Sequence, residues 1–486
     1  MSAVSGTVMV MDMVGRAARR RETALADLDE TERAARGQFF TPTAVAKIMA
    51  RLLKVPDHGV VRVLDPGAGS GMLTATLVSH LATVTPSLRV HVTAVEDDTS
   101  LLSALRETLD DCSVLGAETR LIAEDYVSWA VTSDERFDLV IQNPPYHKLR
   151  VDSTADVLLR NAGIVVPNIY AGFMALAARQ LTPGGQMVAI TPRSWMNGTY
   201  YESFRRGLLD RAAIDAIHTF ASRSSVFGDM GVLQESIIVS VTSNAIQGPV
   251  RLYSSVDQAS ETAERIVPGN QVVTPDFVFV PASRSDADAV SWMASATRTL
   301  ADLGLTVSTG RVVDFRSRDL LRHSPDQPCS PMIYPANIVE RTVQHPRTRL
   351  RKPQWFAIDS TTASKLLVPA GVYVLVKRFS SKEEKRRIVA AVWDDDRAPA
   401  FDNKLNYIHR AGHGLDPGLA RGLAIWLNST RVDDYFRVFS GHTQVNATDL
   451  RHMRFPSHAE LLELARTNSD IDIAVEQLFA ARRKAA

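Results

Sequence analysis

Cysteine is nearly absent from this chain, and so are long apolar segments. The two cysteines, Cys112 and Cys329, lie far apart, which excludes a disulfide framework and a cysteine-rich metal site. Such low cysteine usage suits a reducing cytoplasm. No run of about 18 apolar residues occurs, so the sequence predicts no transmembrane helix. The short apolar patch at residues 8–14 precedes the arginines of residues 19–21, which is the wrong order for a secretion signal.

Charge of neither sign is in large excess, but the charges are unevenly distributed. The 486 residues carry a formal net charge of +1, whereas residues 341–410 hold 15 Lys and Arg against 7 Asp and Glu. Such a basic block predicts either a contact with a polyanion or a solvated face. Contents of 45% hydrophobic and 22% charged residues exclude a mainly disordered or fibrous chain. The length predicts two domains.

The pattern of elements divides the chain into four parts. Residues 1–36 are predicted as a helical N-terminal extension, and residues 246–303 as a connecting segment. Between them, residues 37–245 alternate apolar strands with helical stretches, which predicts an α/β fold: a Rossmann-like, mostly parallel seven-stranded sheet with helices on both faces. The expected strands are 60–64, 90–95, 119–123, 137–142, 186–191, 214–220 and 235–241. Residues 304–486 are irregular and rich in Pro and Arg, and they predict a separate mixed α+β domain.

The first chemically informative motif is a glycine-rich turn, Asp65-Pro66-Gly67-Ala68-Gly69-Ser70-Gly71. It follows a predicted strand and opens a predicted helix, and its glycines let the backbone turn sharply and approach a ligand. Glu96 ends the next strand, where an acidic side chain typically accepts hydrogen bonds from ribose hydroxyls. An acid at Asp65 is poorly placed beside a pyrophosphate and better placed beside a cation. The motif therefore favours S-adenosylmethionine, with its amino and sulfonium groups, over a dinucleotide.

The second motif, Asn143-Pro144-Pro145-Tyr146, follows the strand expected at 137–142. The asparagine side-chain oxygen and a proline-flanked carbonyl can accept both hydrogens of an exocyclic amine. These bonds direct the nitrogen lone pair out of the ring and towards a methyl donor. Tyr146 offers an aromatic face on which a base can stack. Methylation of cytosine C5 needs a cysteine nucleophile, and the sequence has Asn143 where that nucleophile is expected.

Together with Gly37-Gln38-Phe39-Phe40-Thr41-Pro42, these motifs resemble the gamma-class amino-group DNA methyltransferases of restriction–modification systems. In that class the cofactor motif precedes the catalytic motif, and a target-recognition domain comes last. The resemblance covers residues 37–245 strongly and the C-terminal part loosely. It implies transfer of a methyl group from S-adenosylmethionine to the N6 amine of an adenine flipped out of double-stranded DNA, without a metal.

The resemblance also implies which residues hold the cofactor. These residues are Thr41, Asp65, Gly67, Gly69, Glu96, Asp125, Tyr126 and Asn143. Asp65 is expected to meet the cofactor amino group, and Glu96 to hold the ribose. Asp125 is expected to meet the adenine amino group of the cofactor, with Tyr126 beside the adenine ring.

Substrate contacts are implied in both predicted domains. Asn143 and Pro144 are expected to bind the target amine, and Tyr146 and Phe227 to pack against the extruded base. A basic cluster of the C-terminal domain consists of Lys377, Arg378, Arg386 and Arg387. Such residues neutralise phosphates and set register without reading sequence. The segment 440–446 resembles the end of recognition domains in this family, and its Gln444 and Asn446 either read adenine edges or brace a turn.

The sequence thus predicts a site-specific adenine-N6 DNA methyltransferase of the bacterial cytoplasm, associated with the nucleoid and with no membrane contact. Double-stranded DNA is the expected partner, and a separately encoded restriction endonuclease is a second one. Three alternatives stay open: methylation of cytosine N4, action on RNA or on a protein glutamine, and a DNA-binding subunit of a larger defence complex. Enzymes acting on RNA or glutamine usually lack a large C-terminal domain, whereas about 240 residues follow the predicted catalytic fold here.

Overall fold

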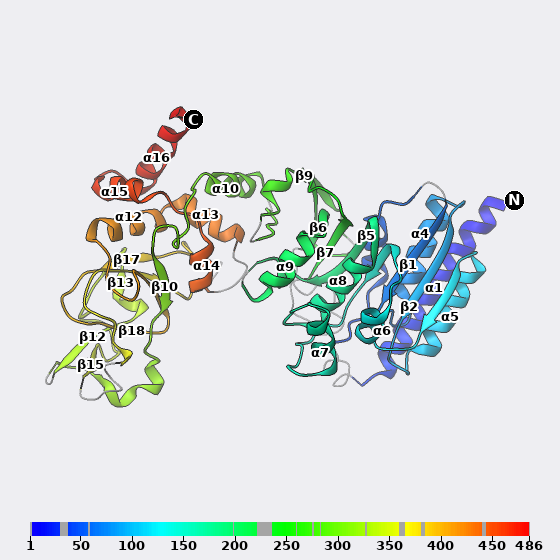
Figure 1. The fold of residues 1–486 in the computed structure, drawn as a ribbon, viewed down its shortest axis with the longest axis horizontal. Coiled ribbons are helices and arrows are strands. Elements are labelled where there is room, and N and C mark those ends of the chain that lie inside the picture. The colour runs from blue at the N-terminus through cyan, green and yellow to red at the C-terminus, as the bar shows by residue number, and fades with distance from the viewer. Residues whose placement is uncertain are drawn as a thin grey trace. The chain divides into compact units, whose positions relative to one another are not determined.

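The computed structural model of the chain describes residues 2–29, 37–56, 59–197, 199–220, 236–258, 260–274, 277–281, 283–325, 328–358, 365–380, 384–439 and 444–485. The chain divides into two compact units, Met1–Val280 and Pro281–Ala486 (Figure 1). The division falls inside the segment 246–303, which the sequence predicts as a connection. Each unit has its own sheets and its own hydrophobic core.

The first unit is built on one sheet, which contains nine strands among the described residues, in the order β3-β2-β1-β4-β5-β7-β6-β8-β9. Its strands are β1 (Val60–Pro66), β2 (Arg89–Val95), β3 (Glu118–Ile122), β4 (Phe137–Gln142), β5 (Leu181–Pro192), β6 (Ala212–Phe220), β7 (Ser236–Ser243), β8 (Val250–Ser255) and β9 (Ala263–Val267). The strands from β3 to β5 run parallel, and β7 inserts antiparallel between β5 and β6. All seven expected strands are present, which confirms the predicted α/β fold.

The sheet extends two strands beyond the expected seven. Strand β8 pairs parallel with β6, and β9 pairs antiparallel with β8. Both strands lie in the segment 246–303, which is predicted as a connection. Val267 is the one buried residue of β9. A strand at the edge of a sheet that buries so little leaves almost no apolar alternation in the sequence, which is why the pattern did not reveal it.

Helices pack on both faces of this sheet, as predicted (Figure 1). One face carries α1 (Ser2–Asp27), α3 (Thr43–Arg51), α4 (Met72–Val84) and α5 (Leu102–Val114). The other carries α6 (Tyr126–Thr132), α7 (Thr154–Asn161), α8 (Ile169–Gln180) and α9 (Glu202–Leu209). Met49 and Leu77 are fully buried in the first core, and Tyr170 and Phe204 are buried in the second. Helices such as α3 and α9 present one apolar face to the core, whereas α4 and α8 are buried on most sides, and α1 packs on α4 and α5.

Helix α1 is an integral part of the first unit. Met13 and Ala17 are buried in the core. Arg16 and Arg20 both form ion pairs with Asp111 on α5, at 2.9 and 2.7 Å. The helical character expected of residues 1–36 holds over Ser2–Asp27, and residues 30–36 lie outside the described ranges.

The second unit has the predicted mixed α+β character. A six-stranded sheet has the order β10-β19-β16-β17-β14-β13, and a four-stranded sheet the order β11-β15-β12-β18, counted over the described residues. The strands are β10 (Thr306–Thr309), β11 (Leu321–Arg322), β12 (Cys329–Ile333), β13 (Ile338–Val339), β14 (Thr342–Val343), β15 (Trp355–Ala357), β16 (Tyr373–Lys377), β17 (Ala390–Trp393), β18 (Ala400–Phe401) and β19 (Leu405–His409). The helices are α10 (Arg284–Ala294), α12 (Pro417–Leu427), α13 (Thr430–Phe439), α14 (Ala447–His452), α15 (His458–Arg466) and α16 (Ile471–Ala485). No helix in the described part of the chain is long and apolar enough to cross a bilayer.

Candidate active site

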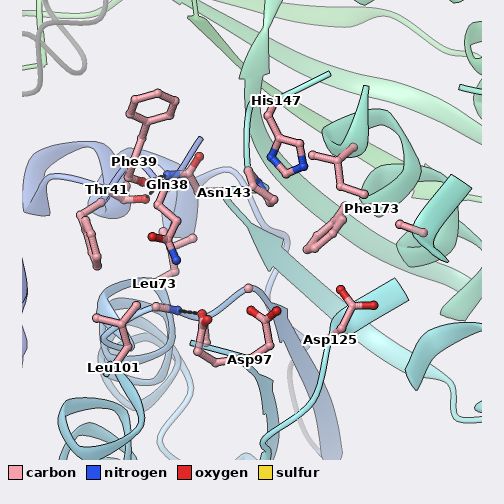
Figure 2. Close-up of a pocket in the computed structure, with 18 of the residues that line it drawn as sticks. Gln38, Phe39, Thr41, Leu73, Asp97, Leu101, Asp125, Asn143, His147 and Phe173 are labelled. Carbon is pink, nitrogen blue, oxygen red and sulfur yellow. Dashed lines mark hydrogen bonds between the residues drawn. The ribbon is translucent and has the colours of Figure 1, made fainter. Parts of the chain in front are cut away.

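The carboxyl ends of β1 to β4 surround a cavity of about 1030 Å³ in the first unit (Figure 2). The turn after β1, the loop after β4 and the N-terminal segment 38–41 supply much of its lining. Asp97 after β2 and Asp125 after β3 complete the wall, and Figure 2 shows both carboxylates below Asn143 in that view. Ligands of doubly wound sheets bind at this edge. The fold thus brings together the three sequence motifs, which are spread over the first third of the chain.

Backbone hydrogen bonds tie the glycine-rich turn to β2. The N–H of Gly67 donates to the carbonyl of Val95 at 2.9 Å. Gly67 and Gly69 both line the cavity, with φ angles of 74° and 59° that other residues rarely adopt. At Gly71 a Cβ atom would lie 2.7 Å from the Thr108 side chain of α5. The helix therefore approaches the turn closely because this residue is glycine.

Glu96 stands at the end of β2, with its carboxylate fixed in the cavity wall. Its Oε2 accepts a hydrogen bond from the N–H of Gly69 at 2.7 Å, and Oε1 accepts one from the N–H of Asp98 at 2.9 Å. Burial raises the pKa of Glu96 to about 7, although the two N–H groups act in the opposite direction. Each carboxylate oxygen has a second lone pair, so Glu96 can still accept hydrogen bonds from a ligand.

Asp65 lies behind the glycine turn. Its side chain is fully buried, and Oδ2 accepts a hydrogen bond from the hydroxyl of Thr74 at 2.6 Å. Its Oδ1 accepts no hydrogen bond from any residue that the structure describes. Burial raises the pKa of Asp65 to about 7. Because Asp65 is not part of the cavity wall, its contact with the cofactor amino group stays a prediction.

Asp125 lines the cavity and caps helix α6. Its Oδ1 accepts hydrogen bonds from the N–H and the hydroxyl of Ser128, at 2.8 and 2.7 Å, which fixes the carboxylate. Tyr126 is instead buried behind the wall, where its hydroxyl donates to Gln180 at 2.7 Å. Phe173 packs on Tyr126, with ring centroids 4.7 Å apart, and faces the cavity. The structure corrects the assignment of Tyr126, because the first residue of α6 points into the core.

The segment 37–41 is held from two sides. The carbonyl of Gly37 accepts a hydrogen bond from the N–H of Tyr146 at 3.0 Å, and a Cβ atom at this position would lie 2.7 Å from the same nitrogen. Arg21 of α1 is buried and donates to the carbonyl of Phe40 at 2.9 Å. The N-terminal helix and the Asn-Pro-Pro-Tyr loop therefore position this segment together.

Asn143 lies at the centre of the site (Figure 2). Its Nδ2 donates to the carbonyl of Phe39 and to the hydroxyl of Thr41, the latter at 3.0 Å. These contacts fix the orientation of the amide, because a carbonyl can only accept. Its Oδ1 is buried and accepts no hydrogen bond from the described residues. Buried polar atoms are normally paired, so this oxygen is an acceptor available to a ligand.

The rest of the Asn-Pro-Pro-Tyr loop is firmly anchored. Pro144 is buried, and Pro145 lines the cavity. The hydroxyl of Tyr146 donates to the carbonyl of Ile190 on β5 at 2.8 Å, and its ring centroid lies 5.3 Å from that of Phe39. Burial raises the pKa of Tyr146 well above its ordinary value. The sequence does not predict this anchor, and stacking of Tyr146 on a base stays a prediction.

Several residues of the cavity wall were missed by sequence reasoning: His147, Lys148, Arg150 and Phe173. Figure 2 shows the His147 imidazole and the Phe173 ring to the same side of Asn143 in that view. The position of residues 147–150 directly after the second motif could have revealed them. Phe173 lies on α8, and no spacing in the sequence connects it with the site.

Two arginines of the predicted basic cluster are bound within the second unit. Arg387 is fully buried; its Nε donates to the hydroxyl of Ser380 at 3.1 Å, and its guanidinium lies 5.4 Å from the ring centroid of Phe436. Arg386 donates to the carbonyl of Asn428 at 2.7 Å. From this position Arg387 cannot contact a phosphate, so its assignment is corrected. A run of basic residues does not reveal which of them point into a core.

The other residues predicted to contact DNA form fewer hydrogen bonds within the second unit. Arg378 donates to the carbonyl of Asn403 at 3.3 Å, and burial lowers the pKa of Lys377. Asn446 caps helix α14, which favours a turn-bracing role over base reading. Phe227 lies outside the described residues.

Comparison with known proteins places the chain in a family. Residues 87–227 match the Eco57I restriction-modification methylase family. The chain is 38% identical over 469 residues to the type II methyltransferase M.PstI of Providencia stuartii, covering 92% of each chain. It is 37% identical over 450 residues to the type II methyltransferase M.BsuBI of Bacillus subtilis, covering 88% of this chain and 89% of that one.

Among solved structures, the type IIL restriction-modification enzyme MmeI, determined in complex with DNA, has a similar fold. The TM-score is 0.50 at 11% identity, over 94% of this chain and 68% of that one. The two type II relatives cover about nine-tenths of the chain at 37–38% identity, which shows the family. This chain belongs to the S-adenosylmethionine-dependent methyltransferases of type II restriction–modification systems.

Proposed function

We propose that this chain transfers a methyl group from S-adenosylmethionine to the N6 amine of an adenine extruded from a specific sequence of double-stranded DNA. The Asn143 amide carries the proposal. Its nitrogen is held by Phe39 and Thr41, and its buried Oδ1 has no donor among the described residues. An exocyclic amine supplies the donor that this oxygen lacks, and leaving such an atom unpaired is costly.

The residues around the glycine turn fit the cofactor. Gly67 and Gly69 present backbone rather than side chains to the cavity, and Glu96 retains acceptor capacity for two ribose hydroxyls. The carboxylate of Asp125 is oriented to accept from an adenine amino group. The Oδ1 of Asp65, which has no hydrogen-bond partner among the described residues, adds a buried acceptor behind the turn, and this suits a cationic ligand better than a pyrophosphate. When bound, S-adenosylmethionine supplies an electrophilic methyl group.

In the reaction, Asn143 Oδ1 and the carbonyl of Pro144 each accept one hydrogen of the target amine. The two bonds draw the nitrogen lone pair out of conjugation with the base and orient it. Thr41 and the backbone of Phe39 act as positioning groups, because they keep the Asn143 amide from rotating. The chain contributes orientation and hydrogen bonds that strengthen as positive charge develops on the nitrogen.

The second unit supports DNA over the other substrates. Residues 281–486 form a compact body of two sheets and several helices, which is large enough to recognise a specific duplex sequence. A glutamine side chain needs no such body. We also propose that this unit recognises the target sequence, that a separately encoded restriction endonuclease cuts the same sequence, and that the chain acts at the nucleoid of the bacterial cytoplasm.

Long-read sequencing of DNA from a methylation-free host that expresses the chain tests this function. The expected result is N6-methyladenine at one recurring sequence, which is lost in the Asn143→Ala variant. Methylated cytosine N4 would change the assigned base. Unmodified DNA together with methylated RNA or glutamine would transfer the function to that substrate.

A further inference from the structure

Two cations at the rim of the cavity belong to the catalytic unit itself. Lys148 and Arg150 follow the Asn-Pro-Pro-Tyr loop, line the cavity and are exposed to solvent. Neither side chain forms a hydrogen bond or an ion pair with another described residue. Arg386 and Arg387 of the second unit, in contrast, are bound to neighbours within that unit. Positive charge without a partner among the described residues therefore lies in the wall of the cavity proposed to receive the target base.

The backbone that carries the two cations is fixed. Residues 147–149 and 167–169 run side by side, joined by two hydrogen bonds of 3.1 and 3.2 Å and by a bridge between Lys148 and Asn168. Arg150 follows this paired stretch, and its carbonyl accepts a hydrogen bond from the N–H of Ser153 at 3.1 Å, so the chain turns there. Being two residues apart, the Cα atoms of Lys148 and Arg150 lie no more than about 7 Å from each other. This separation is close to the distance between neighbouring phosphates of one nucleic-acid strand.

Nearby acids do not neutralise these cations. Asp152 and Asp156 lie at the start of α7, and both form ion pairs with Arg160, at 2.7 and 2.9 Å. Arg160 compensates one of these two negative charges, and neither carboxylate forms an ion pair with Lys148 or Arg150 among the described residues. The charge of Lys148 and Arg150 remains directed to solvent at the mouth of the cavity.

We propose that Lys148 and Arg150 bind the two phosphates that flank the extruded nucleotide. This inference rests on the proposed function, since it takes nucleic acid as the substrate. Phosphate contacts position a strand without reading its sequence. Here they hold the backbone of the target nucleotide at the mouth of the cavity that receives its base, so the catalytic unit contributes its own share of DNA affinity.

The test is the salt dependence of DNA binding by the full chain. Each phosphate contact contributes about 0.9 to the slope of log affinity against log salt, so the Lys148→Ala/Arg150→Ala variant is expected to lose about 1.8. Its thermal unfolding midpoint should match that of the wild type, because both side chains are exposed. Arg89→Ala is the matched control: Arg89 is exposed at the amino-terminal edge of β2, opposite the cavity, and its removal should leave the slope unchanged.

Neutral DNA phosphates give a second test. Methylphosphonates on both sides of the methylated adenine should lower the wild-type slope by the same amount and leave the slope of the double variant unchanged. The inference would be overturned if the double variant kept the wild-type slope or if Arg89→Ala lowered the slope equally. It would also be overturned if the methylphosphonates lowered the slope of the double variant further. A wild-type chain that neither methylates DNA nor binds it in a salt-dependent way would instead overturn the proposed function.

Discussion

The two units use charged and polar residues in opposite ways. In the first unit, Glu96, Asp125 and Asn143 follow three different strands, converge on one cavity and keep acceptor capacity directed towards it. In the second unit, Arg386 and Arg387 make their hydrogen bonds with groups of that unit. The acceptors named in the first unit are therefore available to a ligand, whereas these two arginines of the second unit are part of its fold.

The difference comes from the sheets. Parallel strands end at one common edge, so residues that follow them meet whatever their separation in the chain. The described strands of the second unit are two to five residues long and lie in two sheets without such an edge. Position relative to a strand end therefore predicts exposure to a ligand, whereas local net charge does not.

Asn143→Ala has the largest expected effect, and it tests whether the polar side chains around the cavity of the first unit act on a ligand. Loss of an amine-polarising hydrogen bond should lower kcat at least about 10²-fold, while affinity for S-adenosylmethionine stays near that of the wild type. Single-turnover methylation with purified chain and calorimetry with the cofactor measure the two quantities. A rate within about tenfold of wild type would place less than 1.4 kcal/mol on this contact and refute its role.

Glu96→Ala should reduce cofactor affinity by about 1.5–3 kcal/mol for each charge-assisted hydrogen bond lost. Calorimetry measures the change. Glu118→Ala removes an acid from the amino-terminal end of β3, at the edge away from the cavity, and should leave cofactor affinity unaltered. Equal affinities for Glu96→Ala and the wild type would show that the ribose is held elsewhere.

Arg387→Ala tests the second half of the comparison. Because this guanidinium is buried and donates to Ser380, its loss should lower the free energy of unfolding by about 1–3 kcal/mol. The slope of DNA affinity against salt should not change. Arg410→Ala removes the same charge from an exposed position and should alter stability by less than about 0.5 kcal/mol. A shallower salt slope for Arg387→Ala with normal stability would restore the phosphate assignment.

Cofactor binding should depend on pH near neutrality. Burial raises the pKa of Glu96 from 4.5 to about 7, so the carboxylate is mostly protonated below pH 7 in the free chain. Affinity for S-adenosylmethionine should therefore rise with pH up to about 7 and then level off, by at most about tenfold, or 1.36 kcal/mol, per pH unit. The pKa of Glu96 is higher in the folded chain than its ordinary value of 4.5, so this group adds to the free energy of unfolding at low pH. That contribution is lost as the pH rises from about 4.5 to about 7. Calorimetry should show that affinity for S-adenosylmethionine depends less on pH in Glu96→Gln than in the wild type. The same pH dependence in both would assign it to Asp65, whose pKa is also about 7.

Tyr146→Phe has the smallest expected effect. It removes the hydrogen bond to the carbonyl of Ile190, which should lower the free energy of unfolding by about 0.5–1.5 kcal/mol. The aromatic face remains, so methylation should be retained.

Tyr146→Ala should also lose about 1–3 kcal/mol of target-base binding. Fluorescence of a base analogue at the target position reports this step, and normal flipping in the alanine variant would argue against stacking.

Much of the first unit could be predicted from the sequence, and the exceptions have definable causes. The seven strands were found because each is a short run with apolar residues bounded by turns, including β7, which pairs antiparallel with its neighbours. Strand β9 was missed because it buries one residue, and Tyr126 was misplaced because one position decides whether the start of α6 faces the cavity or the core. Phe173 was missed because it reaches the site from a helix that carries no motif.

The sequence by itself determined the order of elements in the first unit, the glycine turn and the Asn-Pro-Pro-Tyr loop, because these depend on neighbouring residues and on the ends of strands. Only the tertiary structure decided which polar atoms are left for a ligand. Among the described residues, Asn143 Oδ1 has no partner, because Phe39 and Thr41, from a distant segment, take the nitrogen of the same amide. Arg387 is unavailable because Ser380 and Phe436 enclose it. Hydrogen-bond partners come from residues far away in the chain, and a linear pattern does not record them.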